Sequence, residues 1–237
     1  MKDKVFIAIP SGKAPDVDHA VSLTNTIINL IESGMRPERE IMHGNCYVHL
    51  CRDLLTNRFM KSNCTHLFFW DDDVAAPSNA LGRLLSYDRD ITIAAYPKKV
   101  ALGLPPEKTW PVALTDGIPD PYGLLECDMV ATGFLLIKRH VIEKLYEMHA
   151  DRVFYHQPYG EDVINIFPTG LLPDFPLNAM GKPMWWGEDY AFSVLAKRAG
   201  FKIWLDPAIP LLHAGRNVWR GDFSKAADVS DSHSSAA

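Results

Sequence analysis

Three consecutive aspartates, Asp71, Asp72 and Asp73, follow directly on the apolar run Leu67-Phe68-Phe69-Trp70. Adjacent carboxylates repel one another, and a packed domain tolerates them best where a cation offsets the repulsion. Oxygen ligands suit Mg²⁺ and Mn²⁺, so the cluster predicts a divalent metal site. The alternative is a strand that ends in a solvated acidic turn, for which aspartate is an ordinary residue.

Two further carboxylates and two aromatic rings stand together at the predicted start of a helix, in Trp185-Trp186-Gly187-Glu188-Asp189. Acids at this position can serve only to cap the helix and to stabilise its dipole. The flat apolar rings of Trp185 and Trp186 fit a platform for a sugar or a planar acceptor, but they could equally belong to the core.

The elements that would position these residues alternate through the first 96 residues. Apolar runs predict strands at 5–9, 40–43, 66–70 and 91–95, and helical periodicity predicts helices at about 16–34, 47–60 and 78–87. This alternation predicts an α/β fold with a mostly parallel central sheet flanked by helices. Ligands of such sheets lie at the carboxyl ends of the strands, where the aspartates stand.

The second half of the chain is less regular. We expect strand material over 124–137 with a break at Gly133, helices over 140–148 and 188–199, and strands over 202–205 and 209–213. The segments 100–122 and 154–183 predict long connections, the second of them on the acceptor side. We expect one domain over residues 1–222 and a polar, disordered tail over 223–237.

Composition excludes several classes of protein. The chain has 237 residues and a net charge of −5, and it has no basic stripe of the kind that binds a nucleic-acid backbone. No apolar segment approaches the ~20 residues that span a membrane. The four cysteines form no C-x-x-C pair and no export signal precedes them, so we expect reduced thiols and a cytoplasmic location.

An acidic D-x-D element after a strand near residue 70, a G-E-D tripeptide that opens a later helix, and His213 at the end of a late strand occur here in one order. In this order they resemble the landmarks of GT-A glycosyltransferases of the family-2-like kind, over roughly residues 4–220. The resemblance implies a GT-A (Rossmann-like) fold and a metal site in which Asp73 is the principal carboxylate. Asp71 would be its partner toward the metal or the ribose, Asp72 the variable middle position, and His213 the residue that completes the metal shell.

Alternate residues of an extended strand point the same way, which would also put Asp71 and Asp73 on one side. Taken alone, a histidine at a strand end is more often a surface or packing residue. The resemblance makes Asp189 the base that deprotonates an acceptor hydroxyl, with Glu188 contacting the acceptor or assisting.

Further assignments concern the nucleotide. The resemblance places the base and ribose at Pro10-Ser11, which are also ordinary turn residues. It implies a nucleotide contact for Arg52, whose alternative is a solvated helix face. Lys98, in Tyr96-Pro97-Lys98-Lys99, would lie near the diphosphate. Gly133 would leave room for the donor sugar, although a β-bulge explains this glycine as well.

The predicted reaction is transfer of a sugar from a nucleoside diphosphate sugar, UDP favoured, to an acceptor hydroxyl, with Mn²⁺ or Mg²⁺ and with inversion. A saccharide or another small acceptor is favoured, and a modified DNA base is the alternative. A non-catalytic nucleotide-sugar or carbohydrate-binding protein of the same fold, and a metal-dependent nucleotidyltransferase or phosphohydrolase, are the competing interpretations. The sequence leaves the oligomeric state open.

Overall fold

The computed structural model describes residues 3–45, 47–99, 109–215, 218–221 and 223. Its largest sheet contains β1 (Val5–Ser11), β2 (Glu38–His43), β3 (His66–Trp70), β5 (Ile91–Ile93), β6 (Val112–Pro119), β7 (Leu125–Val130), β8 (Phe134–Lys138) and β13 (Ile203–Leu205). Their order is β2-β1-β3-β8-β5-β13-β7-β6, and β8 and β7 run against the other six strands. The predicted mostly parallel central sheet is therefore confirmed.

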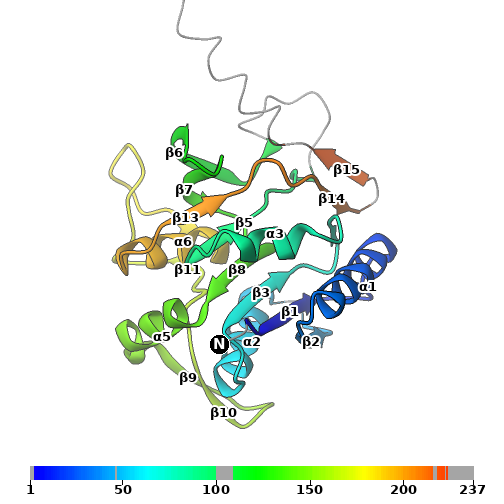
Figure 1. Cartoon of the computed structure of the whole chain (residues 1–237). Coiled ribbons are helices and arrows are strands. Elements are labelled where there is room, and N and C mark those ends of the chain that lie inside the picture. The colour runs from blue at the N-terminus through cyan, green and yellow to red at the C-terminus, as the bar shows by residue number, and fades with distance from the viewer. Residues whose placement is uncertain (1–2, 46, 100–108, 216–217, 222, 224–237) are drawn as a thin grey trace, which may run out of the picture.

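Helices cover both faces of this sheet (Figure 1). On one face lie α2 (Val48–Lys61), α5 (Arg139–Met148) and α6 (Glu188–Arg198), and on the other lie α1 (Val17–Glu32) and α3 (Ala80–Ser86). Successive residues of β3 enter the two cores in turn, because side chains alternate across a strand. Leu67 and Phe69 pack with the first group of helices, and Phe68 and Trp70 with the second. A strand buried on both faces is a nearly continuous apolar run, as in Leu67–Trp70.

The start of α1 follows from its sequence. Asp16 is the N-cap, and its carboxylate accepts a hydrogen bond of 2.9 Å from the backbone N–H of Asp18. Gly34 follows the helix with a φ of 76°, a left-handed conformation that glycine adopts without strain. The predicted helix over 16–34 is therefore confirmed, with bounds shorter by one or two residues at each end.

A small second sheet joins the chain after the aspartates to the late strands. It consists of β4 (Val74–Ala75), β14 (Leu211–Ala214) and β15 (Val218–Gly221). The antiparallel register pairs His213 with Val74 and Leu212 with Ala75. His213 is thereby fixed beside the residue that follows Asp73.

Two predicted connections are wrong in part. The segment 100–122 contains β6, an edge strand whose exposed residues and Gly117 conceal the apolar pattern that marks a buried strand. Residues 100–108 of this segment lie outside the described part of the chain.

The segment 154–183 also contains regular structure, after a short 3₁₀ helix, η1 (Ala150–Arg152). β9 (Val153–His156) and β10 (Glu161–Ile164) form a hairpin, and β11 (Gly170–Leu171) pairs with β12 (Trp185–Trp186). The hairpin is tied to α2 by ion pairs from Glu161 to Arg58 and Lys61. These long-range contacts stabilise strands that local periodicity does not indicate.

At the carboxyl end, Phe223 is buried and packs edge-on against Trp110, with ring centroids 5.1 Å apart. This contact places Phe223 with the core rather than in the predicted tail, whose remaining residues, 224–237, lie outside the described structure. Cys51, Cys64 and Cys127 are buried, and Cys46 is not among the described residues. Across the described residues, no helix is long and apolar enough to cross a membrane.

Candidate functional site

The three aspartates form a turn rather than the end of a strand. β3 ends at Trp70, and the backbone N–H of Val74 donates to the carbonyl oxygen of Asp71 over 3.1 Å before β4 begins. The expected alternation along an extended strand is therefore wrong here, because the strand has already ended. Each carboxylate has different partners, so the three residues have different parts in the site.

Asp71 forms an ion pair with Arg52 of α2. The Arg52 guanidinium lies 2.9 Å and 3.2 Å from the two carboxylate oxygens of Asp71. The same guanidinium lies 3.8 Å from a carboxylate oxygen of Glu188 and 4.0 Å from one of Asp189. Three carboxylates from two distant segments therefore surround one cation, with an excess of negative charge.

The Arg52 side chain is only 2% exposed, which excludes the solvated helix face as its position. Burial alone would lower its pKa, but the carboxylates of Asp71, Asp189 and Glu188 raise it. Its Nε and Nη1 are buried and have no hydrogen-bond partner among the described residues. Such donors can serve a ligand or a water molecule at the site.

Asp189 stands in the first turn of α6, whose N-cap is Gly187. Its carboxylate accepts hydrogen bonds from the backbone N–H of Thr132, over 3.2 Å, and from the Thr132 hydroxyl. Burial raises the pKa of Asp189, and Glu188 adds to the rise, whereas Arg52 and Thr132 oppose it. Asp189 is thus held by residues outside its own helix, and helix capping alone does not describe its contacts.

Asp73 faces a different group of residues. One carboxylate oxygen lies 3.4 Å from Nε2 of His213, and the other forms a short ion pair with the ammonium group of Lys99. Burial would raise the pKa of Asp73, but hydrogen bonds from His213 and Lys99 lower it to about 2. The Asp73 carboxylate is therefore ionised throughout the neutral range.

The orientation of His213 is set by the backbone. Its Nδ1 lies 2.7 Å from the carbonyl oxygen of Pro97, an acceptor, so Nδ1 carries the proton. When the ring is protonated, Nε2 can donate to Asp73, whereas in neutral imidazole Nε2 carries a lone pair and is the nitrogen that can bind a cation. The Tyr96 ring packs edge-on against the imidazole with centroids 4.8 Å apart and restricts its rotation.

Asp73 and His213 fit a divalent cation in donor type and orientation. Within the described ranges, however, no three His, Cys, Asp or Glu side chains are already gathered as a metal site. Mg²⁺ and similar hard cations are commonly held by one or two protein ligands together with substrate phosphates and water. The donor set therefore fits a cation that arrives with a phosphorylated substrate.

Asp72 anchors the turn to neighbouring elements. Its carboxylate accepts a hydrogen bond of 2.7 Å from the hydroxyl of Ser11, at the end of β1, and its carbonyl oxygen accepts one of 2.8 Å from the N–H of Asp16. Pro10 lies within β1, opposite Met42 of β2, and is buried. Ser11 is therefore engaged with the acidic turn, and Pro10 with the sheet.

Gly133 lies against the acidic turn for a steric reason. A Cβ at this position would lie 2.4 Å from a carboxylate oxygen of Asp71 and 2.5 Å from the hydroxyl of Tyr96. The backbone N–H of Gly133 donates to the same hydroxyl over 3.2 Å, and its carbonyl accepts from Asp71 over 2.9 Å. Close approach of Asp71 and Tyr96 explains this glycine, so a β-bulge is not needed.

The two tryptophans differ in position. Trp185 is 76% exposed, whereas Trp186 is 3% exposed and packs edge-on against Phe175. The core interpretation therefore holds for Trp186, and Trp185 alone is available as a surface platform.

Lys98 donates its backbone N–H to Thr109, while its neighbour Lys99 pairs with Asp73. The site thus gathers Arg52, Asp71, Asp73, Glu188, Asp189 and His213, and its lysine is Lys99, which the sequence pattern did not distinguish from Lys98.

Thr132, Tyr96 and His19 also escaped the sequence analysis as site residues. Thr132 and Tyr96 stand next to motifs that the sequence does mark, at Gly133 and Lys98, and this adjacency was the available signal. His19 is buried on the inner face of α1, and its Nδ1 lies 3.0 Å from the carbonyl oxygen of Val74. Burial lowers the pKa of His19, although the three aspartates oppose this shift.

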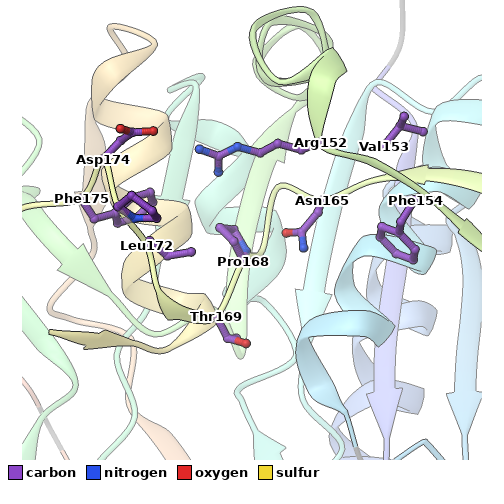
Figure 2. A pocket seen from close by; sticks show the side chains of 10 residues that line it. Arg152, Val153, Phe154, Asn165, Pro168, Thr169, Leu172, Asp174 and Phe175 are labelled. Atoms are coloured by element: carbon purple, nitrogen blue, oxygen red, sulfur yellow. The ribbon is translucent and has the colours of Figure 1, made fainter. Parts of the chain in front are cut away.

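A separate pocket of about 410 Å³ lies beside the β9–β10 hairpin. Its lining includes Arg152, Phe154, Asn165 and Phe175, and Figure 2 shows the Arg152 side chain extending across it toward Asp174. None of the acidic residues of the site lines this pocket. The predicted acceptor-side segment therefore forms a hollow of its own, apart from the acidic turn.

No protein-family model and no curated protein matches the chain. Among solved structures, A197 from STIV matches with a TM-score of 0.52 and 17% identity over 92% of this chain and 94% of that one. GalNAc-T7 with UDP, GalNAc and Mn²⁺ matches with a TM-score of 0.46 and 12% identity, over 90% of this chain and 44% of that one. A glycosyltransferase involved in the glycosylation of the major capsid of PBCV-1 matches with a TM-score of 0.34 and 10% identity, over 59% of this chain and 62% of that one. The match to A197 and the sheet order support the predicted α/β fold with a mostly parallel central sheet, and likenesses at these identities do not assign an activity.

Proposed function

We propose that the chain is a metal-dependent glycosyltransferase that moves a sugar from a nucleoside diphosphate sugar to an acceptor hydroxyl with inversion. The observation that carries the proposal is the meeting of two charged groups at one turn. Asp73 and His213 form a pair suited to a cation. Asp189 lies 4.0 Å from the guanidinium of Arg52, which also pairs with Asp71 of the same turn. A cation site and a base candidate at the end of a central strand suit group transfer from a diphosphate.

Asp73 and His213 would hold Mn²⁺ or Mg²⁺, with Asp71 directed to the same cation or to the ribose. When bound, the cation stabilises the negative charge of the departing diphosphate. Lys99 adds a positive charge next to Asp73 and would pair with a phosphate oxygen when the diphosphate is bound. A UDP-sugar is the favoured donor.

Asp189 would act as the base. Its raised pKa brings it closer to neutrality, where a carboxylate is more effective at accepting a proton from a hydroxyl. The hydrogen bonds from Thr132 fix the carboxylate, and Arg52 opposes the rise of its pKa. Glu188, 3.8 Å from Arg52, would contact the acceptor or assist.

The exposed ring of Trp185 lies three residues before Glu188 and would stack on the acceptor. A saccharide or another small hydroxyl compound is the favoured acceptor, and a modified DNA base is the alternative. The cytoplasmic location remains a prediction.

The decisive experiment incubates the protein with UDP-, GDP-, CMP- and dTDP-sugars, with Mn²⁺ or with EDTA, and measures release of the nucleotide. We expect Mn²⁺-dependent hydrolysis of one donor, and loss of it in Asp73→Ala and His213→Ala. Asp151→Ala, which removes an exposed carboxylate far from the turn, is the matched control.

Three outcomes would contradict the proposal. Turnover that persists in EDTA would show that the reaction does not need a divalent metal. Tight nucleotide binding without turnover of any donor would indicate a non-catalytic binding protein. Release of pyrophosphate from a nucleoside triphosphate and a sugar phosphate would indicate a nucleotidyltransferase.

A further inference from the structure

Tyr96 contacts both halves of the candidate site. It stands three residues beyond β5 and is 7% exposed. Its ring packs edge-on against the imidazole of His213, with centroids 4.8 Å apart and ring planes at 66°. Its hydroxyl, at the far end of the side chain, accepts the backbone N–H of Gly133 over 3.2 Å. One side chain thus reaches the histidine that faces Asp73 and the backbone that is hydrogen-bonded to Asp71.

The ring of Tyr96 and the residue that follows it hold His213 in one orientation. The carbonyl oxygen of Pro97 lies 2.7 Å from Nδ1 of the imidazole, so that Nε2 lies 3.4 Å from Asp73. The terminal torsion of a histidine side chain is otherwise broad and roughly two-fold, and a flipped ring would turn Nε2 away from the carboxylate. Partners of this kind orient metal-binding histidines, and their loss typically lowers metal affinity about 10- to 100-fold.

The hydroxyl of Tyr96 supports a stretch of backbone that fixes two carboxylate residues. The carbonyl oxygen of Gly133 accepts the N–H of Asp71 over 2.9 Å, and the N–H of Thr132 donates to the carboxylate of Asp189 over 3.2 Å. The N–H of Gly133 is buried, and a buried N–H needs an acceptor. Without the hydroxyl, we expect the backbone at 132–133 to move, and Asp189 to move with it.

The competing interpretation is that Tyr96 only packs in the core. It belongs to the same buried cluster as Ala94 and Phe134, and its ring would then serve as any other apolar side chain. Removing the hydroxyl or the ring of such a residue would lower the stability of the protein. It would not alter metal affinity and reaction rate separately in the folded protein.

We propose that Tyr96 is a positioning residue, whose ring orients the cation pair of Asp73 and His213 and whose hydroxyl fixes the base, Asp189. This inference rests on the proposed function, which gives these residues their parts. The two ends of one side chain then make different contributions. The ring contributes to metal affinity, and the hydroxyl contributes to the rate of proton transfer.

Two substitutions separate the ring from the hydroxyl. Tyr96→Phe removes only the hydroxyl, and Tyr96→Met removes the ring but keeps an apolar side chain. Electron paramagnetic resonance of free Mn²⁺, with UDP present, measures the Kd for Mn²⁺, and release of the nucleotide from the donor that the wild type hydrolyses measures kcat. Tyr96→Phe should lower kcat at least tenfold and leave the Kd within twofold. Tyr96→Met should lower kcat as well and raise the Kd at least tenfold.

Tyr87→Phe is the matched control. The hydroxyl of Tyr87 donates to Asp206 over 2.8 Å, so this substitution also removes a hydrogen-bonded hydroxyl, but one outside the candidate site. It should leave the Kd for Mn²⁺ and kcat unchanged. Circular dichroism identifies the variants that fold, and Tyr96→Leu replaces Tyr96→Met if the latter does not.

Three results would overturn the inference. An unchanged kcat in folded Tyr96→Phe, or an unchanged Kd for Mn²⁺ in a folded variant without the ring, would exclude this role and leave the proposed function standing. Equal losses of Mn²⁺ affinity in Tyr96→Phe and Tyr96→Met would show that the ring does not orient His213. A wild type that neither binds Mn²⁺ nor releases a nucleotide would contradict the proposed function itself, and the inference with it.

Discussion

The guanidinium of Arg52 lies 2.9 Å from a carboxylate oxygen of Asp71, and the arginine side chain is buried. The same guanidinium lies within 4.0 Å of Glu188 and Asp189. One residue of α2 thus joins the end of β3 to the start of α6. It is a positioning residue, because it neutralises the carboxylates that carry the proposed chemistry.

Replacement of Arg52 by methionine should therefore destabilise the protein severely. The variant keeps the volume of the side chain but leaves three carboxylates without their cation, a loss of about 3 to 5 kcal/mol where a buried ion pair is broken. Urea unfolding at pH 7 measures the loss. The deficit should shrink at pH 4, where protons can neutralise the carboxylates, and a deficit independent of pH would contradict the electrostatic cause.

Gly133→Ala should disturb the acidic turn by contact alone. The added methyl group would lie 2.4 Å from Asp71 and 2.5 Å from the Tyr96 hydroxyl, so neighbouring groups have to move. We expect a loss of about 1 to 3 kcal/mol in the free energy of unfolding. Tyr96→Phe removes one of the two obstructing atoms, so Gly133→Ala should cost less in that background, and strictly additive losses would argue against the clash.

Local pattern predicted β3 with its observed bounds, because all five of its residues are buried and the four after His66 are apolar. The order of the strands in the sheet could not be predicted from local pattern. β8 lies between β3 and β5 and is antiparallel to both, and the sequence of residues 134–138 does not indicate this position. Tertiary pairing decides it.

The candidate site likewise has residues that the sequence indicated and contacts that it did not. Asp71, Asp73, Asp189 and His213 were visible as candidates, since an acidic element after a strand, a G-E-D tripeptide and a late histidine occur in one order along the sequence. Their partners were not, because the Asp73 contact to Lys99 depends on a turn that replaces the expected strand. The side chains of Asp71 and Asp73 contact different partners, Arg52 for the first and Lys99 and His213 for the second.

Asp73→Asn should lower stability in a pH-dependent way. The folded-state pKa is about 2 against an ordinary value of 3.8, so the contribution of this carboxylate is fully present above pH 3.8 and is lost as the pH falls through 2. The variant should be less stable by about 2 kcal/mol at pH 7, measured by urea unfolding in EDTA. The difference from wild type should vanish near pH 2, and a constant difference across this range would refute the linkage.

Asp53 should show the opposite dependence. This buried carboxylate accepts backbone hydrogen bonds from Ile166 and Phe167, over 2.9 Å and 3.1 Å, yet burial raises its pKa to about 8. The folded state keeps its proton longer than the unfolded state, so stability falls as the pH rises from 3.8 to 8, by at most about 1.4 kcal/mol per pH unit. Asp53→Asn retains an acceptor oxygen for both N–H groups and should remove this fall.

Urea unfolding of wild type and Asp53→Asn at pH 5, 7 and 9 measures the dependence of stability on pH. The variant should gain on wild type with each step, and a gain that does not grow with pH would show that the carboxylate is ionised in the folded protein.

Trp185 and Trp186 form a matched pair, since the two rings differ in burial and stand next to each other. Trp186→Ala removes a core ring packed on Phe175 and should cost about 3 to 5 kcal/mol. Trp185→Ala removes an exposed ring and should change stability by less than about 0.5 kcal/mol. If Trp185 stacks on the acceptor, its loss should raise the acceptor KM at least tenfold and leave donor hydrolysis without acceptor unchanged. An unchanged acceptor KM would show that Trp185 does not bind the acceptor, and it would not affect the proposed donor site.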